Sequence, residues 1–542
     1  MEKRLLLAIV LSVLVLFLYN LYFYKEAEKR QKLYKKPAQQ EEISSAPTLS
    51  IPEIVEEAPV VERKKPALKI KEEELLLKTS LMEVKLNPEG RISSWKLFKF
   101  KEKNNELVEL IHPPVVEDNY PLKVLLGNKE FIPTDFSILN GGQREFVYTS
   151  VDMPQVKIIK QISFYPDSYA INVNIMVVND SETPLKDQEV TLQWESPPNP
   201  RHGTASHSVI LEQKCFIDGK DKKIEHKSKG FLDGALSVIG LIPPVPPEDS
   251  VRVKEGKISW IAQDSQYFLN ILLPDEFVER AIFIKKIDGR QIMSLVIPKL
   301  NILPHQSSSF KFKVYGGPKD IEILKSLAFG AERLTGIGIL PGVIHWILKK
   351  LYCLTHNYGV SIILLTFIIK ILLHPLTRKN FIVMKDMQKK MKALQPELTK
   401  LKEKHKNDKE SLNREMMELY KQYKVNPLGG CLPLVLQMPV FFALFTALNK
   451  SIELRGASFL IWQDLSASDP LYILPILMGA TMFIQQKMTP SVDPQQAKIG
   501  MMMTIVFTLI FLSFPVGLVL YWLIQNILTI AEQYLINKGI EK

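Results

Sequence analysis

Lys370 is the residue of this chain whose position most directly implies a chemical task. It lies within residues 360–373, which are largely apolar, and no acidic residue in that segment neutralises it. A charge at membrane depth costs roughly 2.5–3.5 kcal/mol on insertion scales, so it usually faces protein or a water-filled cavity. There, Lys370 would attract acidic groups. The alternative is that its long side chain only snorkels to the membrane surface.

Uncharged polar residues accompany Lys370 in the apolar segments of the last third of the chain. Each one alone is typical of hydrogen bonding between membrane helices. Together with a cation that has no acidic neighbour in its own segment, they predict a hydrated cavity. The candidates are Thr366, Gln437, Gln485, Gln525, Asn526 and Thr529.

Other kinds of chemistry find little support in the sequence. The chain has no GxxxxGK[ST] loop, which excludes the common phosphate-binding loop of nucleotide hydrolases. Its three cysteines form no CxxC pair and belong to no Cys/His cluster of the kind that binds zinc. Residues 201–207, RHGTASH, lack a matching nucleophile elbow and are interpreted as a polar loop. These segments therefore indicate neither a nucleotide site, a metal site nor a hydrolase site.

The composition of the 542-residue chain changes along its length. Residues 1–24 contain an apolar run long enough for a transmembrane anchor. Residues 25–67 are rich in Glu, Lys, Gln and Pro, which predicts a flexible linker. Across residues 68–318 apolar residues alternate with polar ones, as at Met82, Val84 and Leu86, which predicts one large β-sandwich domain.

After the β region, in residues 319–356, apolar residues begin to recur at the spacing of a helix. One stripe is apolar and consists of Leu340, Ile344, Ile347, Leu348 and Leu351, while the other faces carry His345, Lys349 and Lys350. This pattern predicts an amphipathic helix that lies in the membrane interface. A soluble helix that caps the β domain is the alternative.

Residues 357–542 contain five apolar segments that predict membrane spans. They are residues 358–376, 428–448, 471–486, 499–514 and 516–536. With the N-terminal anchor, the expected fold is a multi-domain membrane protein. It has an α-helical membrane core of six spans, a large periplasmic all-β sandwich domain and a cytoplasmic helical hairpin.

The predicted hairpin, residues 377–425, lies between the first two of these five spans. Its apolar residues are spaced three and four apart, which is typical of two antiparallel helices that share a seam. Residues 378–424 contain fourteen Lys and Arg against seven Asp and Glu, so the positive-inside rule predicts a cytoplasmic hairpin. The same rule explains the net charge of +11 without a nucleic-acid ligand. The hairpin residues expected to contact a partner are Met384, Met387, Met391, Lys404, His405 and Lys406.

Counting spans from the hairpin predicts that both chain termini are cytoplasmic and that residues 25–357 lie outside. Six basic residues within residues 25–36 then also lie outside, against the positive-inside rule. The larger charge excess of the hairpin is expected to dominate.

Several segments resemble the YidC family of membrane-protein insertases. They are VNPLGGCLP at 425–433, QMPVF at 437–441, LSASDPLYILPILMG at 465–479 and FPVGLVLYW at 514–522. Lys370 in TFIIK, residues 366–370, matches the position of the family's groove cation, and Trp522 in the last segment joins the groove candidates. The resemblance covers about residue 358 to the end. The anchor, β domain and interfacial helix resemble the Gram-negative branch more loosely.

This resemblance implies an insertase of the bacterial inner membrane that is not an enzyme and has no cofactor, with its β domain in the periplasm. A groove open to the cytoplasm and to lipid would receive polar parts of nascent membrane proteins, alone or beside the Sec translocon. The family's groove cation is usually arginine, whereas Lys370 provides a point charge. Because the tail at residues 537–542 is short, the hairpin would carry more of any docking of the ribosome or targeting machinery.

Two other classes of function remain as alternatives. A small-solute transporter or channel would require paired ionisable residues across several spans, and in the sequence only Lys370 stands out. A membrane-anchored periplasmic enzyme would place its chemistry in the β domain and would not need the hairpin.

Overall fold

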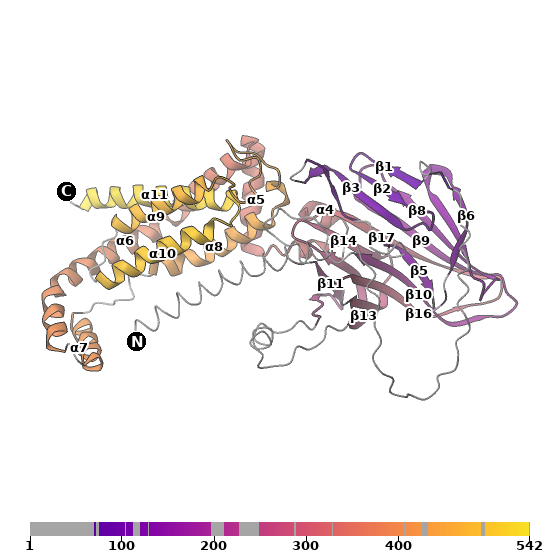
Figure 1. Cartoon of the computed structure of the whole chain (residues 1–542), viewed down its shortest axis with the longest axis horizontal. Coiled ribbons are helices and arrows are strands. Elements are labelled where there is room, and N and C mark those ends of the chain that lie inside the picture. Colours follow the sequence, from indigo (N-terminus) through magenta and orange to yellow (C-terminus); the bar gives the residue numbers. More distant parts are fainter. Residues whose placement is uncertain are drawn as a thin grey trace, which may run out of the picture.

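The structure, a computed structural model, has a β-rich part and a helical part at opposite ends of the molecule (Figure 1). It describes residues 70–71, 75–102, 105–111, 120–127, 129, 131–196, 211–226, 249–286, 289–327, 329–405, 408–423, 432–488 and 494–540. The predicted anchor at residues 1–24, the predicted linker at residues 25–67 and the polar loop at residues 201–207 lie outside these residues.

The described strands form two antiparallel sheets. The smaller sheet has the order β1(Leu76–Lys78), β2(Met82–Leu86), β3(Ile92–Lys101), β4(Leu107–Glu109). The larger, 13-stranded sheet has the order β5-β10-β16-β15-β13-β14-β17-β9-β8-β7-β6, and β11 pairs with β12 and β13. Its strands are β5(Lys123–Leu126), β6(Ile132–Ile138), β7(Arg144–Thr149), β8(Val156–Phe164), β9(Ala170–Asn179), β10(Leu185–Ser196), β11(Glu212–Ile217), β12(Lys220–Lys223), β13(Ser250–Asp264), β14(Phe268–Pro274), β15(Val278–Lys285), β16(Gln291–Ile302) and β17(Gln306–Pro318).

Alternating side chains explain why these segments are strands with one buried face. In β2 the side chains of Met82, Val84 and Leu86 are buried and those between them are partly exposed. Successive side chains of a strand point to opposite faces, so a period of two buries one face of the sheet. The predicted β-rich region is confirmed.

The two sheets contact one another where Trp95 of β3 lies over Gly316 of β17. A Cβ atom at Gly316 would come within 2.8 Å of the Trp95 ring, so only glycine allows this approach. Trp95 itself is fully buried. Large aromatic side chains contribute much of the buried apolar area of a core, and here one of them fills the space between the two sheets.

The helical part follows β17. Its longer helices are α5(Ile339–Thr355), α6(Tyr358–Lys404), α7(Lys409–Gln422), α8(Leu432–Lys450), α9(Ile473–Met488), α10(Pro494–Phe511) and α11(Val516–Ile540). Short helical turns are η1(Asn140–Gly142) in the β region, then α4(Ile321–Ser326), η2(Ala331–Thr335) and η4(Ile452–Leu454). All five segments predicted as spans are helical over most of their described residues.

Length and hydropathy distinguish two of the described helices. Tyr358–Leu401 within α6 and Val516–Ile536 within α11 are long and apolar enough to cross a membrane. Gly500–Phe511 of α10 is apolar but shorter. The helical segments therefore lie where spans are predicted. Length and hydropathy identify two of the described helices as candidate spans, fewer than the prediction.

The first predicted span and the first arm of the predicted hairpin form one continuous helix of 47 residues, α6. Asn357 caps its N-terminus by accepting a hydrogen bond from the Val360 N–H at 3.1 Å, which satisfies one of the unpaired donors of the first turn. Asp408 caps the returning helix α7 in the same way, accepting from the N–H groups of Glu410 and Ser411. The hairpin is therefore an extension of the first predicted span and not a separate unit.

Helix α5 corresponds to the predicted interfacial helix, but one of its polar residues is placed differently. His345 is buried, and its Nε2 lies 3.1 Å from Oε2 of Glu453 in η4. Lys349 of the same helix lies 3.3 Å from Oε1 of Glu453 and 3.6 Å from Oδ2 of Asp320, which follows the β region. The helical pattern placed His345 away from the apolar stripe. Its burial is possible because Glu453, which is far away along the chain, lies beside it in the fold.

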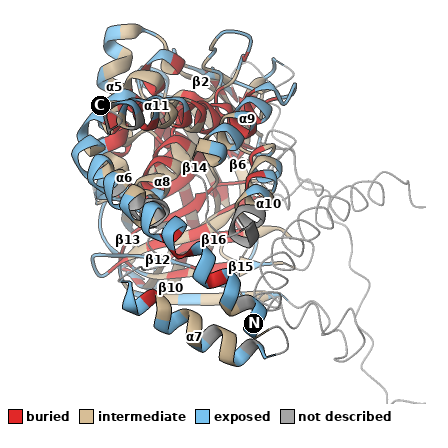
Figure 2. Cartoon of the chain, turned by 90° about the vertical axis from the view of Figure 1, so that its left-hand side faces the viewer, coloured by how far each residue is buried: buried red, intermediate tan, exposed pale blue. Residues whose placement is uncertain are grey.

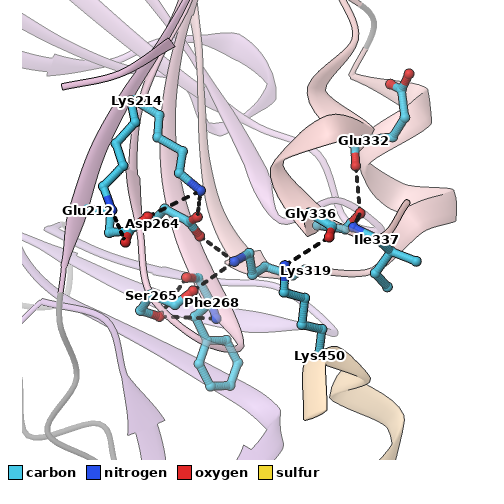
Figure 3. A network of polar contacts seen from close by, with 12 residues as sticks. Glu212, Lys214, Asp264, Ser265, Phe268, Lys319, Glu332, Gly336, Ile337 and Lys450 are labelled. Atoms are coloured by element: carbon cyan, nitrogen blue, oxygen red, sulfur yellow. Dashed lines mark hydrogen bonds and ion pairs between the residues drawn. The ribbon is translucent and has the colours of Figure 1, made fainter. Parts of the chain in front are cut away.

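Polar contacts gather where the β region lies near the end of α8 (Figure 3). Asp264 of β13 forms ion pairs with Lys214 and with Lys319, both at 2.5 Å. Lys450, at the end of α8, donates to the Gly336 carbonyl oxygen at 2.8 Å. Close by, the Arg455 guanidinium lies 3.0 Å from Glu102 Oε1 and over the Phe268 ring at 5.1 Å. The Arg455 contacts join the β region to the loop between α8 and α9.

We expect Glu453 to make the stability of this junction depend on pH. Burial alone would raise the pKa of Glu453, but the hydrogen bond and charge of His345 and the charge of Lys349 lower it from 4.5 to about 2. A carboxyl whose pKa is lowered in the folded state stabilises the fold fully above its unfolded pKa, and this contribution is lost as the pH falls through the folded value. The contribution is at most about 3 kcal/mol, since one pKa unit corresponds to about 1.4 kcal/mol.

Thermal unfolding of the detergent-solubilised chain at about pH 7, 5 and 3 measures this effect. The unfolding midpoint should fall more steeply between the two lower pH values in the unsubstituted chain than in Glu453→Gln. Equal falls in both proteins would show that Glu453 contributes nothing to the acid sensitivity.

Candidate functional site

Lys370 points from α6 toward α11, where two side chains bind its ammonium group. Its Nζ donates to Thr529 Oγ1 at 2.9 Å and lies 2.7 Å from Oε2 of Glu532. The side chains of Lys370 and Glu532 are only 11% and 7% exposed. An ammonium held in this way does not fit the snorkelling alternative, in which it would lie in headgroup water.

The interpretation of Lys370 as an unpaired cation is therefore wrong. Its partner, Glu532, lies in a different helix, and searching the Lys370 segment alone missed it. A signal was nevertheless present in the sequence. Across the five predicted spans after residue 357, Lys370 is the only Lys or Arg and Glu532 the only Asp or Glu. Charges inside membrane segments tend to pair with one another, so their pairing was a reasonable expectation.

Two further residues of α6, His374 and Thr377, bind the same carboxylate and were also missed. His374 Nδ1 lies 2.8 Å from Glu532 Oε1, and Thr377 Oγ1 donates to the same oxygen at 3.0 Å. Lys370, His374 and Thr377 are spaced four and three apart, which places them on one face of the helix. On the facing helix, Thr529 and Glu532 are three apart. Spacings of three and four residues thus place the cluster on the facing sides of α6 and α11.

Helix α11 contributes most of the other predicted groove residues, because it packs against α6, α8 and α9. Asn526 is buried and donates to Thr481 Oγ1 of α9 at 3.2 Å. Oε1 of Gln525 is buried and has no hydrogen-bond partner among the described residues. Trp522 packs with its ring centroid 5.1 Å from that of Phe441 on α8. These three predicted groove residues therefore all lie on α11.

The remaining predicted groove residues contact other partners than Lys370. Gln437 of α8 donates to Tyr521 Oη at 3.4 Å. Thr366, fully buried on α6, donates to the Ile362 carbonyl oxygen at 2.7 Å, a bond within its own helix. Gln485 of α9 is half-buried. The structure thus brings Lys370, Thr529 and Glu532 together directly, while Gln437 and Asn526 form separate hydrogen bonds between helices.

The hairpin seam is apolar, as predicted. Met391, Leu394 and Leu398 of α6 are buried against Tyr420 of α7, and Met387 packs at the edge of this cluster. At the tip, Glu415 of α7 lies 3.4 Å from Lys404 Nζ and 3.0 Å from His405 Nε2. The Met384 side chain and Lys406 lie outside the described residues. Figure 2 shows exposed residues over much of the outward surface of α6 and α7.

The chain matches known families along most of its length. The family described as "60Kd inner membrane protein" matches residues 350–542, and the one described as "YidC periplasmic domain" matches residues 74–354. A relative from Syntrophus aciditrophicus, named "Membrane protein insertase YidC", is 36% identical over 572 residues, with 99% of this chain and 100% of the relative covered. The chain belongs to the YidC family of membrane protein insertases.

The chain is also similar to other YidC proteins. The relative of the same name from Citrifermentans bemidjiense is 40% identical over 418 residues, covering 75% of this chain and 72% of its own length. A solved structure described as "Active YidC insertase crystal structure with the first transmembrane domain resolved" aligns with 85% of this chain and 92% of that one. Its sequence identity is 18% and its TM-score 0.37.

Membership of the YidC family confirms the resemblance first indicated by the short motifs. It agrees with the expectation of an insertase that is not an enzyme. The two matching family descriptions also combine an inner-membrane protein with a periplasmic domain, as expected for the helical and β-rich parts of this chain.

Proposed function

We propose that this chain inserts newly made proteins into the bacterial inner membrane through a hydrophilic groove that contains Lys370. The observation that supports this most strongly is the match to YidC insertases over 99% of the chain. The buried ion pair between α6 and α11 adds physical support, because polar groups inside an apolar helix bundle usually serve a function.

The proposed mechanism uses only the residues of the chain and the properties of the membrane. A polar or acidic passenger segment loses hydration when it enters hydrocarbon, and this is unfavourable. Thr366, Gln437, Gln485, Gln525 and Asn526 would line a partly hydrated path, Trp522 would form part of its wall, and Lys370 would attract acidic passenger residues. The apolar passenger helix then leaves for the lipid, which provides the driving force without nucleotide hydrolysis.

The proposed arrangement in the membrane has six spans, with a multi-pass core at residues 357–542. Residues 1–24 would anchor the chain and residues 25–67 would link the anchor to a periplasmic β domain at 68–318. Exposed apolar side chains on α5, among them Val343, Trp346 and Leu354, suit a helix that rests in the interface at residues 319–356.

The partners of the proposed insertase are nascent membrane proteins, membrane lipids and, for some passengers, the Sec translocon. The ribosome or targeting machinery would meet the hairpin at residues 377–425. Its basic surface suits anionic headgroups or ribosomal RNA, and its methionine residues adapt to varied apolar contacts.

Reconstitution into liposomes tests the proposed function. The full chain should promote insertion of a short membrane protein, scored by protection of the inserted passenger from protease. It should cause neither solute flux nor hydrolysis of added substrates. Liposomes without the chain provide the baseline, and equal insertion in both would refute the proposal.

One observation favours a second candidate, a small-solute transporter. Lys370, His374 and Glu532 form an ionisable cluster across two helices, and such clusters also occur in proton and ion pathways. In the same liposomes, a proton gradient that drives solute uptake, without any gain in passenger insertion, would support this candidate over the insertase.

The proposed topology predicts which parts of the chain are accessible from each side of the membrane. A cysteine at Asn407 in the hairpin should react with a membrane-impermeant thiol reagent only after the inner membrane is opened. A cysteine at the exposed Val151 of the β region should react in cells whose outer membrane alone is permeable. Because positive charges favour the cytoplasmic side, the opposite labelling pattern would invert the orientation derived from the hairpin.

A further inference from the structure

Glu532 is held in place by three side chains of α6. Its Oε2 lies 2.7 Å from Lys370 Nζ, and its Oε1 is 2.8 Å from His374 Nδ1 and 3.0 Å from Thr377 Oγ1. Both carboxylate oxygens are therefore engaged, and the side chain is only 7% exposed. The carboxylate is positioned by contacts that do not all depend on Lys370.

Lys370 is bound differently, because both of its contacts come from α11. A lysine ammonium has three N–H donors, and among the described residues Thr529 Oγ1 accepts a hydrogen bond from one of them, while Glu532 Oε2 is an ion-pair partner at 2.7 Å without a hydrogen bond. Its flexible four-carbon stem allows the ammonium to turn toward another acceptor. If it does, Glu532 keeps its contacts with His374 and Thr377.

We propose that Glu532 sets the specificity of the Lys370 site by competing with acidic passenger residues for the Lys370 ammonium. This inference rests on the proposed function, since it requires a passenger at Lys370. A passenger carboxylate that approaches Lys370 meets an ammonium that is already paired. It must share or replace the Glu532 contact, and two carboxylates at one site repel each other.

The competition makes the site selective among acidic passengers. Without Glu532, an isolated cation would attract every carboxylate that entered the groove. With Glu532 in place, only a carboxylate that approaches Lys370 closely, and accepts a hydrogen bond from an N–H that does not point to Thr529, gains a favourable contact. Glu532 thereby lowers the preference for acidic over neutral passengers, and its removal should raise that preference.

The test uses the full chain in liposomes and two passengers that differ only by Asp or Asn at one position of the translocated segment. The measured quantity is the ratio of inserted Asp passenger to inserted Asn passenger. We expect Glu532→Gln to raise this ratio roughly three- to tenfold, because the amide keeps the shape and removes the competing charge. Glu532→Asp keeps the charge on a shorter side chain and should give a smaller rise.

Glu453→Gln is the matched control. Glu453 also pairs with one histidine and one lysine, but it lies at the junction with the β region. This variant should keep the unsubstituted ratio. A ratio that Glu532→Gln and Glu532→Asp leave unchanged or lower would overturn the inference. If Glu532→Gln does not accumulate as a folded protein, the ratio of Glu532→Asp decides alone.

Lys370→Ala separates this inference from the proposed function. If Lys370→Ala reduces insertion of the Asp passenger while Glu532→Gln leaves the ratio unchanged, the groove charge stands and only the role of Glu532 is refuted. If Lys370→Ala affects neither passenger, the electrostatic groove itself fails, and the inference about Glu532 fails with it.

Discussion

Replacing Lys370 by glutamate should nearly abolish insertion of passengers with acidic translocated segments. The new carboxylate would repel the passenger and would face Glu532, which now lies 2.7 Å from the Lys370 ammonium. Lys370→Ala should impair insertion less and Lys370→Arg should retain it, because arginine keeps the charge. One partly hydrated charge pair is worth on the order of 1–4 kcal/mol at an effective dielectric between those of water and of a protein surface.

The measurement is insertion into liposomes of two passengers that differ by one acidic residue. The acidic passenger should lose more than its neutral counterpart in each variant. The double variant Lys370→Glu/Glu532→Lys restores an ion pair between α6 and α11 and controls for loss of folding. If both passengers lose insertion equally, Lys370 acts as a structural or hydrating residue and not as an electrostatic receptor.

Shortening the hairpin should produce the second large effect. Deleting residues 402–412 and joining the arms through a short glycine linker removes four lysines at the tip. The buried seam of Met391, Leu394, Leu398 and Tyr420 remains, so the protein should still fold and accumulate. The deletion also removes Glu403, Asp408 and Glu410, so the net loss is one positive charge. Each basic charge near an anionic surface contributes about 1 kcal/mol of attraction, so insertion should fall severalfold.

A charge-only variant separates length from charge in this prediction. Lys404→Gln, Lys406→Gln and Lys409→Gln together keep the length of the hairpin and remove most of the basic charge of the tip. If the charge recruits lipid or ribosomal RNA, this triple variant should lose much of the insertion that the deletion loses. Full insertion by the deletion variant, measured in the same liposomes, would mean that the tip is a passive connector.

The sequence alone determined the local elements of this protein. A period of two identified strands such as β2, because alternate side chains of a strand enter the core. Spacings of three and four identified the hairpin seam, in which Met391 and Leu394 are buried as expected. These patterns depend on neighbours within a few residues, so they can be read along the chain. The short motifs near residues 425–441 and 514–522 likewise indicated the YidC family.

Only the tertiary structure decided which charged groups are paired. Glu532 lies far along the chain from Lys370, and their contact exists because α11 packs against α6. His345 is buried for a similar reason, since η4 brings Glu453 to α5. The periodicity of one helix says which residues share a face but not which helix covers that face. Ion pairs between helices therefore depend on packing, and the chemistry of this site depends on such a pair.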